Sequence, residues 1–413
     1  MRPRFLTRRA IQLALTANAL RPLPGNRAAI PAFFAGWLTG ELAPHLLALT
    51  AADTAAHVAR EGSKSDRVAL GLSALSAAGL TKLIVDAQRA RGEVEQALAE
   101  ALGPRYVEGL RRPPGPKDLA TPWGQLLLPF RMAHPQVRRD RNIAYAPGGR
   151  RYLLDVYRPK EPVEGRPVLL QIHGGAWMVD NKDHQGIPLM LHMAQRGWVC
   201  VAINYPLSPA ARWPAHIVAV KRAVAWIREN IGRYGGDPSF LAATGGSAGG
   251  HLAALLSLTP NDTTLQPGFT DADTTIQACV PHYGVYDFAA TSGSPASEYR
   301  LKGLLAHYVV GKDPVEFLDE YKAASPLDRI NDKAPPFFVI HGSRDTMVPV
   351  REAREFVRRL RQASPNPVAY AELAGAQHAF DIFPSVRSAH VVRGVERFLE
   401  WAYLRSLLGR VRG

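Results

Sequence analysis

The chain contains 413 residues, of which 46% are hydrophobic and 21% are charged. This balance is typical of a globular protein and excludes a disordered or collagen-like chain. The 50 Lys and Arg residues outnumber the 36 Asp and Glu residues, for a formal net charge of +14. No nucleic-acid-binding signature accompanies this charge, so no nucleic-acid partner is expected. Only two cysteines occur, Cys200 and Cys279, both in apolar runs, which predicts buried thiols and excludes a disulfide scaffold.

Residues 1–135 are expected to form a helical N-terminal extension. Two apolar stretches occur there, at 28–49 and 68–80. Prolines, glycines and a glutamate interrupt the first, and the second is short. Because a bilayer span needs about 20 apolar residues, neither qualifies as a span by itself. The apolar run at 11–20 is also too short and too weakly hydrophobic for a clear signal peptide. Six arginines and no acidic residue occupy residues 1–27: Arg2, Arg4, Arg8, Arg9, Arg21 and Arg27.

Two interpretations of this extension stay open. It can be a helical cap that buries its apolar faces against the main domain. Alternatively, it can make a peripheral membrane contact with its arginines at the lipid headgroups. The expected localisation is therefore either cytoplasmic or associated with the membrane or cell envelope. Residues 103–135, which include the run RRPPGPK, are predicted to be a linker.

Residues 136–413 are expected to form an α/β domain. The run YLLDVY at 152–157 predicts a hairpin strand, and apolar runs predict further strands at 167–173, 198–205, 240–244, 276–283, 336–342 and 368–373. Helical patterns lie between them; in 214–232, for example, apolar residues recur every three or four positions. Strands that alternate with amphipathic helices indicate a mostly parallel sheet with helices on both faces.

A glycine-rich motif follows the strand at 240–244. It reads Gly-Gly-Ser-Ala-Gly-Gly over residues 245–250, and a helical pattern comes directly after it. A strand, a G-x-S-x-G turn and a helix in this order are typical of a nucleophile elbow. Because Gly245 and Gly249 lack Cβ atoms, the turn can be tight enough to expose the hydroxyl of Ser247. We therefore predict that Ser247 is a nucleophile.

A second motif, HGGAW at 173–177, follows the strand at 167–173. Its small residues let the backbone approach a substrate carbonyl closely. The N–H groups of Gly175 and Ala176 are expected to donate to the carbonyl oxygen, together with the N–H of Ala248. This predicts an oxyanion hole.

A serine nucleophile needs a base, and the base needs an orienting acid. In this architecture the order along the chain is serine, acid, histidine. Asp345 follows the strand at 336–342, and His378 follows the strand at 368–373, so they are the expected acid and base. Asp287 and Asp381 are alternative acids, although Asp287 lies one strand too early and Asp381 too close to His378 in sequence.

Four motifs in this order, HGGAW, GGSAGG, HGSRDTMVP and GAQHAF, resemble those of α/β-hydrolases of the hormone-sensitive-lipase-like carboxylesterase group. The resemblance is strongest to mycobacterial-type esterases with a helical N-terminal extension, and it covers residues 138–405. It implies the α/β-hydrolase fold, a Ser247–His378–Asp345 triad and hydrolysis of carboxylic esters. The implied oxyanion-hole residues are His173, Gly174, Gly175, Ala176 and Ala248. One departure is Ala176, which stands where the family usually has a third glycine.

The expected reaction is a two-step acyl transfer that uses no metal or cofactor. The expected substrates are small-molecule or lipid esters with short to medium acyl chains. Trp177, Tyr205 and a lid-like insertion at about 288–333 are candidates to line the substrate pocket, with simple packing as the alternative. Two other functions stay open on the same fold: an amide-cleaving enzyme such as an arylformamidase, and a non-catalytic ligand-binding homologue.

Overall fold

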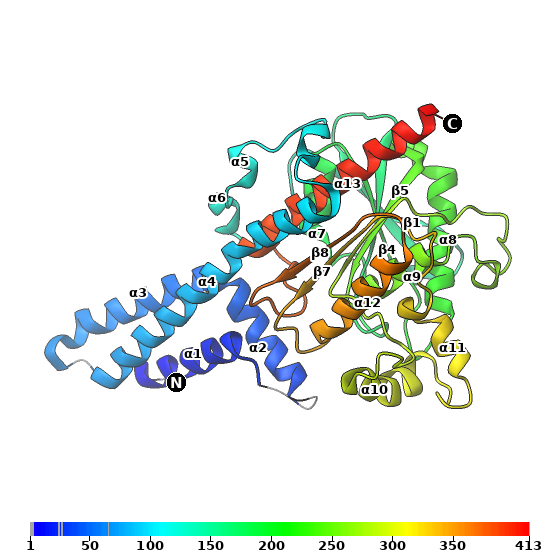
Figure 1. The fold of residues 1–413 in the computed structure, drawn as a ribbon. Coiled ribbons are helices and arrows are strands. Elements are labelled where there is room, and N and C mark those ends of the chain that lie inside the picture. Colours follow the sequence, from blue (N-terminus) through cyan, green and yellow to red (C-terminus); the bar gives the residue numbers. More distant parts are fainter. Residues whose placement is uncertain (1–3, 24, 26–27, 65, 413) are drawn as a thin grey trace.

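The computed structural model describes residues 4–23, 25, 28–64 and 66–412. It contains a central sheet covered by helices, with a group of N-terminal helices projecting to one side (Figure 1). Arg2 and Arg27 of the arginine-rich segment lie outside the described residues.

The sheet has eight strands in the order β1-β2-β4-β3-β5-β6-β7-β8. The two strand pairs that involve β2 are antiparallel and the other pairs are parallel. The strands are β1 (Val137–Ala144), β2 (Leu153–Pro159), β3 (Arg166–Ile172), β4 (Val199–Ile203), β5 (Gly236–Gly246), β6 (Ala278–His282), β7 (Phe337–Gly342) and β8 (Val368–Leu373). The predicted mostly parallel sheet is confirmed.

Both faces of the sheet are buried under helices. Alternate residues of β3 show this, since Val168 and Leu170 pack into the core on one face and Leu169 packs into the core on the other. The first face is covered by α8 (Ala215–Asn230), α9 (Ala248–Leu258) and α12 (Val350–Ala363). The second is covered by α7 (Ile187–Gln195) and α13 (Val386–Arg412). Cys200 and Cys279 are buried and unpaired, as predicted.

In the described residues up to 102, the N-terminal extension contains four α-helices: α1 (Phe5–Leu20), α2 (Ala29–Glu41), α3 (Ala43–Glu61) and α4 (Arg67–Leu102). The side chain of Asp66 caps α4 by accepting hydrogen bonds from the N–H groups of Val68 and Ala69. The N-terminal half of α4 packs against α1 and α3, and its C-terminal half packs against α13 and β8 (Figure 1). The extension is therefore joined to the main domain through one continuous helix.

Among the described residues, α4 alone is long and apolar enough to cross a membrane by length and composition, and 28% of its most apolar stretch is buried. The sequence pattern indicated an apolar stretch of only 68–80, shorter than α4, because Thr81 and Lys82 follow it.

Residues 103–135, the predicted linker, connect the extension to the main domain along its surface. They contain the short helices α5 (Pro116–Leu119) and α6 (Trp123–Leu126) and are bonded to the second face of the domain. Asp118 pairs with Arg196 at 2.7 Å, and Arg393 donates to the carbonyl of Ala120. These contacts hold the segment against α7 and α13.

Candidate active site

Ser247 lies in a sharp turn between β5 and α9, with φ 57° and ψ −120°. A non-glycine residue in this region carries a strain of about 1–3 kcal/mol. The turn is possible because its neighbours lack side chains: a Cβ at Gly249 would lie 2.1 Å from the carbonyl oxygen of Ile172, and one at Gly245 would lie 2.5 Å from the same atom. Ser247 therefore occupies the predicted elbow, immediately before the first turn of a helix.

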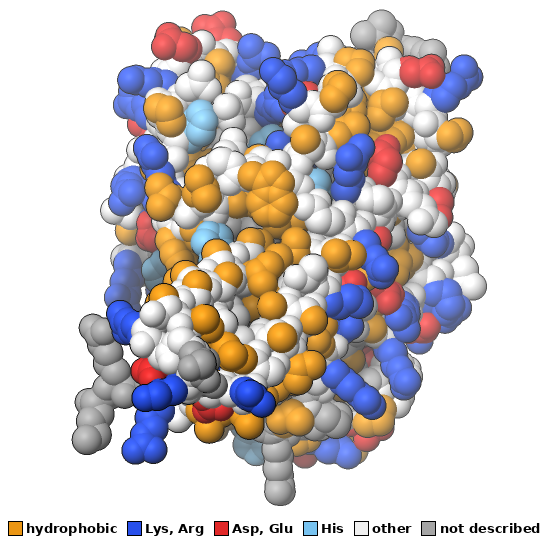
Figure 2. Space-filling view, turned by 90° about the vertical axis from the view of Figure 1, so that its left-hand side faces the viewer, with side chains coloured by type: hydrophobic (Ala, Val, Ile, Leu, Met, Phe, Trp, Pro, Cys, Tyr) orange, Lys and Arg blue, Asp and Glu red, His pale blue; other side chains and the backbone are white. Residues whose placement is uncertain are grey.

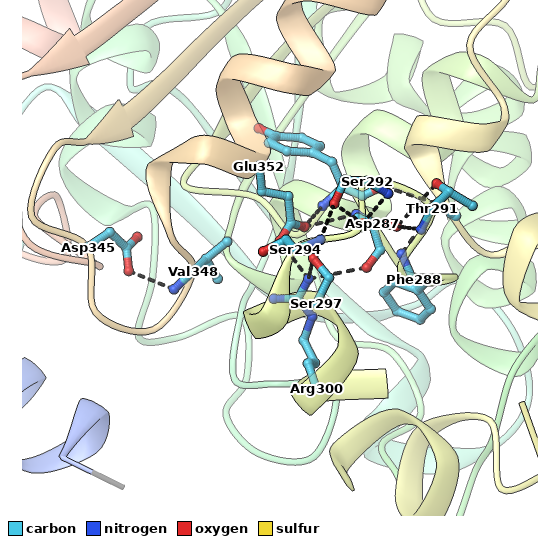
Figure 3. Close-up of polar contacts among 12 residues, drawn as sticks. Asp287, Phe288, Thr291, Ser292, Ser294, Ser297, Arg300, Asp345, Val348 and Glu352 are labelled. Atoms are coloured by element: carbon cyan, nitrogen blue, oxygen red, sulfur yellow. Dashed lines mark hydrogen bonds and ion pairs between the residues drawn. The ribbon is translucent and has the colours of Figure 1, made fainter. Parts of the chain in front are cut away.

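His378 and Asp345 meet in the loops that follow β8 and β7. His378 Nδ1 lies 2.6 Å from Asp345 Oδ2. The other carboxylate oxygen accepts the N–H groups of Met347 and Val348, each at 2.8 Å; Figure 3 shows the contact with Val348. A second imidazole, that of His341, has its Nε2 3.3 Å from Asp345 Oδ2.

These contacts keep Asp345 ionised. Burial raises its pKa, but the imidazoles of His378 and His341 and their hydrogen bonds outweigh burial and hold the pKa well below its usual value. An ionised carboxylate at this position accepts the Nδ1–H of His378. The Nε2 atom is then the proton acceptor of the ring.

The two alternative acids have other partners. Asp287 accepts hydrogen bonds from the N–H groups of Thr291 and Ser292. Asp381 is bonded to His282 and Tyr283. Of the three candidate acids, only Asp345 is hydrogen-bonded to His378 among the described residues. Among the residues that the structure describes, no hydrogen bond joins Ser247 Oγ to His378. Catalytic hydrogen bonds of this kind often form or shorten only when substrate binds.

The HGGAW loop leaves some N–H groups free and uses others. The N–H of Gly174 is taken by Gln185 Oε1 at 2.7 Å. The N–H groups of Gly175, Ala176 and Ala248 have no hydrogen-bond partner among the described residues. Gly174 therefore supports the loop, and the groups available to a substrate oxygen are narrowed to these three.

His173 contributes packing to this loop. Its Nδ1 lies 2.7 Å from the Gly174 carbonyl oxygen, and its ring stacks on Tyr205 with centroids 4.3 Å apart. Burial lowers the pKa of His173 to about 4, so its ring is neutral at pH 7.

For Trp177 and Tyr205, the candidates to line the substrate pocket, the structure favours the packing alternative. Both are buried in the core, 2% and 0% exposed. Trp177 Nε1 donates to His251 Nδ1 at 3.2 Å, and the Tyr205 hydroxyl donates to the His173 carbonyl at 3.0 Å. Both side chains are fixed by packing and hydrogen bonds, and they hold the HGGAW loop in place.

The insertion at 288–333 is attached to the domain close to the Asp345 loop. It contains α10 (Pro295–Arg300), a π-helical segment (Leu301–Val309) and α11 (Leu318–Ala323). Glu352, in the first turn of α12, accepts the N–H groups of Tyr286 and Asp287 and pairs with Arg300 at 2.6 Å. Figure 3 shows this cluster beside Asp345. The insertion is thus anchored by a buried ion pair.

The N-terminal extension reaches the site as well, which the motifs did not indicate. The ring of Phe33, in α2, lies edge-on to His378 with centroids 5.9 Å apart. The Thr346 hydroxyl, next to Asp345, donates to the Ala29 carbonyl at 3.0 Å. At the other end of α2, Glu41 is buried against Arg387 and Ser385. Among the described residues, no group of three or more His, Cys, Asp or Glu side chains is arranged to hold a metal ion.

The strand order, the elbow and the histidine–carboxylate pair define an α/β-hydrolase. The family model BD-FAE matches residues 154–360. The chain is 44% identical to the probable carboxylic ester hydrolase LipM of Mycobacterium tuberculosis, over 98% of this chain and 94% of that protein. It is 46% identical to esterase LipQ of the same organism, over 78% of this chain and 77% of that protein.

Solved structures of esterases also match this chain. A truncated carbohydrate esterase from gut microbiota matches with a TM-score of 0.55 and 26% identity, covering 64% of this chain and 98% of that one. Esterase 2 of Thermogutta terrifontis matches with a TM-score of 0.52 and 25% identity, covering 64% of this chain and 92% of that one. The chain therefore belongs to the hormone-sensitive-lipase-like carboxylesterases of the α/β-hydrolase fold, and it is a carboxylic ester hydrolase.

Proposed function

We propose that Ser247, His378 and Asp345 are the nucleophile, base and orienting acid of this esterase, acting on esters with short to medium acyl chains. The observation that carries the proposal is the 2.6 Å bond from His378 to Asp345 in a site whose serine lies on a strained elbow. A serine on a strained elbow, together with a histidine–carboxylate pair in the loops after the last two strands, is typical of a serine hydrolase.

The reaction runs in two steps. Ser247 Oγ attacks the carbonyl carbon while His378 Nε2 takes its proton, and the Asp345 carboxylate stabilises the imidazolium that forms. The tetrahedral intermediate collapses, and the alcohol leaves with the proton from His378. Water then attacks the acyl-enzyme, with His378 again acting as the base, and releases the acid.

The free N–H groups of Gly175, Ala176 and Ala248 would bind the oxyanion of each intermediate. Each such donor is worth about 3 kcal/mol in the transition state. The N-terminus of α9 adds the favourable end of a helix dipole at the same point. Ala176 keeps its N–H but carries a methyl group at φ 53°, which narrows the approach of the acyl group.

The test is the hydrolysis of nitrophenyl butyrate by purified Ser247→Ala protein. We expect at least a thousandfold loss of kcat, since removing a triad member leaves only oxyanion-hole and binding contributions. Activity at the wild-type rate would overturn the assignment. Comparing a formanilide with a nitrophenyl ester tests the amide-cleaving alternative: preferred turnover of the formanilide would favour an arylformamidase.

We further propose that the N-terminal extension binds the surface of a membrane. Large apolar side chains are exposed along its helices: Ile30, Phe34 and Leu38 on α2, Leu49 and Val58 on α3, and Val68 and Leu75 on α4. Hydrophobic side chains gather through the middle of this face, with Lys and Arg flanking them (Figure 2). Exposed apolar surface of this extent marks an interaction site.

Charge favours a lipid as the partner. Arg60 on α3 and Arg67 on α4 are exposed, as are Arg4 and Arg21 at the two ends of α1. Apolar side chains bordered by basic ones match the boundary between acyl chains and anionic headgroups. A membrane contact here would place α2, and the Phe33 that it holds beside His378, next to lipid esters.

The test is co-sedimentation of the full chain with vesicles of anionic or zwitterionic lipid. We expect salt-sensitive binding to anionic vesicles, and a several-fold loss of binding in a Phe34→Ser, Leu38→Ser variant. Val315→Ser is the control because Val315 is 88% exposed in the insertion, away from the N-terminal helices. Equal binding by the double variant and wild type would contradict the proposal.

A further inference from the structure

A second carboxylate, that of the partly buried Asp381, lies three residues after His378. It is bonded to two consecutive residues at the end of β6: His282 Nδ1 lies 2.6 Å from Asp381 Oδ2, and the Tyr283 hydroxyl donates to Oδ1. Asp381 thus ties the loop that carries the proposed base to a neighbouring strand.

The same two residues contact the nucleophile elbow. The carbonyl oxygen of His282 accepts the N–H of Ser247 at 3.0 Å. A Cβ at position 246 would lie 2.6 Å from the Tyr283 hydroxyl, so the tyrosine packs directly against the backbone before Ser247. The Tyr283 ring also lies against the imidazole of His378, with centroids 4.6 Å apart and planes 58° apart.

The backbone of Tyr283 is strained to make these contacts. Its φ is 36°, in a region that a bulky residue rarely adopts. Its N–H donates to the Ile340 carbonyl at 2.7 Å, which holds the turn in place. Strain of this kind is retained where the surrounding structure imposes it, and it clusters at functional sites.

We propose that His282, Tyr283 and Asp381 are positioning residues that set the geometry between Ser247 and His378. They join the elbow to the histidine loop through one carboxylate, one hydroxyl and one backbone carbonyl. This inference rests on the proposed roles of Ser247 and His378. Because the cluster acts through His378, loss of the cluster misplaces the base in the transition state but leaves the binding of the ester intact. A misplacement of about 1 Å can lower the rate a hundredfold.

The test compares Tyr283→Phe and Asp381→Asn with wild type on nitrophenyl butyrate. Tyr283→Phe keeps the ring on His378 but removes its bond to Asp381. We expect kcat to fall at least tenfold in each variant, with KM within twofold of wild type. Asparagine keeps only one acceptor oxygen at position 381, so it cannot accept from both His282 and Tyr283. The double variant should therefore lose less than the product of the two single losses, because both changes act on the Tyr283–Asp381 contact. Thermal unfolding establishes whether each variant is folded. If Asp381→Asn does not fold, Tyr283→Phe alone decides the test.

Tyr157→Phe is the matched control. Tyr157 is a buried tyrosine on β2 whose hydroxyl has no hydrogen-bond partner among the described residues, so its kcat should equal that of wild type. Unchanged kcat in folded Tyr283→Phe, or a rise in KM with unchanged kcat, would overturn the positioning role. If Ser247→Ala retained activity, the proposed function itself would fail, which separates the two outcomes.

Discussion

Phe33 and His378 lie edge to face with ring centroids 5.9 Å apart, although one belongs to the N-terminal extension and the other to the last loop of the site. Phe33 also stacks on Trp37, one turn further along α2, with centroids 5.5 Å apart. Trp37 in turn contacts Phe383. Aromatic side chains of α2 therefore contact the loop that presents His378, and the extension borders the proposed active site.

This relationship predicts different effects from two neighbouring phenylalanines. Phe33 is partly buried against His378, whereas Phe34 is 53% exposed. We expect Phe33→Ala to lower kcat/KM for nitrophenyl butyrate about tenfold, since about 1.4 kcal/mol of apolar contact is lost near the reacting atoms. Phe34→Ala should stay within twofold of wild type. Equal values for the two variants would show that α2 does not contribute to the site.

The Phe33 contact also shows where sequence reasoning ends. Phe33 and Phe34 are neighbouring apolar residues of the same kind, so the sequence pattern does not indicate which of them faces inward. Nothing near Phe33 has the spacing of a catalytic motif. The contact arises only when α4 carries the extension back over the sheet, and that tertiary placement has no local signal.

The parts that could be predicted depend on local rules. A helix such as α8 buries every third or fourth residue, and its predicted apolar stripe, Ile217, Val220, Val224 and Ile227, is fully buried. The elbow could be located because only glycines fit around Ser247. For Trp177 and Tyr205 the sequence left pocket lining and packing open, because a position next to a motif does not determine whether a side chain faces a cavity or the core.

Buried histidines predict that acid destabilises the fold. Burial lowers the pKa of His251 to about 3 and that of His216 to about 4, whereas histidine in an unfolded chain has a pKa of about 6.5. As the pH falls from about 6.5 toward 4, the unfolded chain therefore binds protons that the folded chain does not. The free energy of unfolding then drops, by about 1.4 kcal/mol per histidine for each pH unit.

Urea unfolding between pH 7.5 and pH 5 measures this dependence. His251→Gln should show a flatter fall in stability across the range than wild type, whatever its stability at pH 7.5. Parallel curves for the two proteins would mean that His251 does not contribute to acid sensitivity.

The ion pair that anchors the insertion predicts a large loss of stability. The side chain of Arg300 is 10% exposed and that of Glu352 is 2% exposed, and both belong to the polar cluster in Figure 3. Glu352→Gln leaves the guanidinium buried without a counter-charge, which costs about 3–5 kcal/mol. The urea midpoint should fall accordingly.

The control is Arg354→Gln, which removes a pair with Glu372 whose side chains are 54% and 27% exposed. An exposed pair of this kind contributes about 0–1 kcal/mol. Similar losses in Glu352→Gln and Arg354→Gln would show that the buried pair does not anchor the insertion.

Two glycine-to-alanine changes test the elbow through the space around the added methyl group. At Gly249 the new Cβ would lie 2.1 Å from the Ile172 oxygen and 2.7 Å from the His173 oxygen, and both are backbone atoms. The β3 end and the HGGAW loop would have to move away from Ser247, so we expect more than a hundredfold loss of kcat. At Gly92, on an exposed turn of α4, nothing lies within 4 Å of the new Cβ, and alanine should stabilise the helix by about 0.5–1 kcal/mol. Full activity in Gly249→Ala would contradict the close contact between β3 and α9 that exposes the Ser247 hydroxyl.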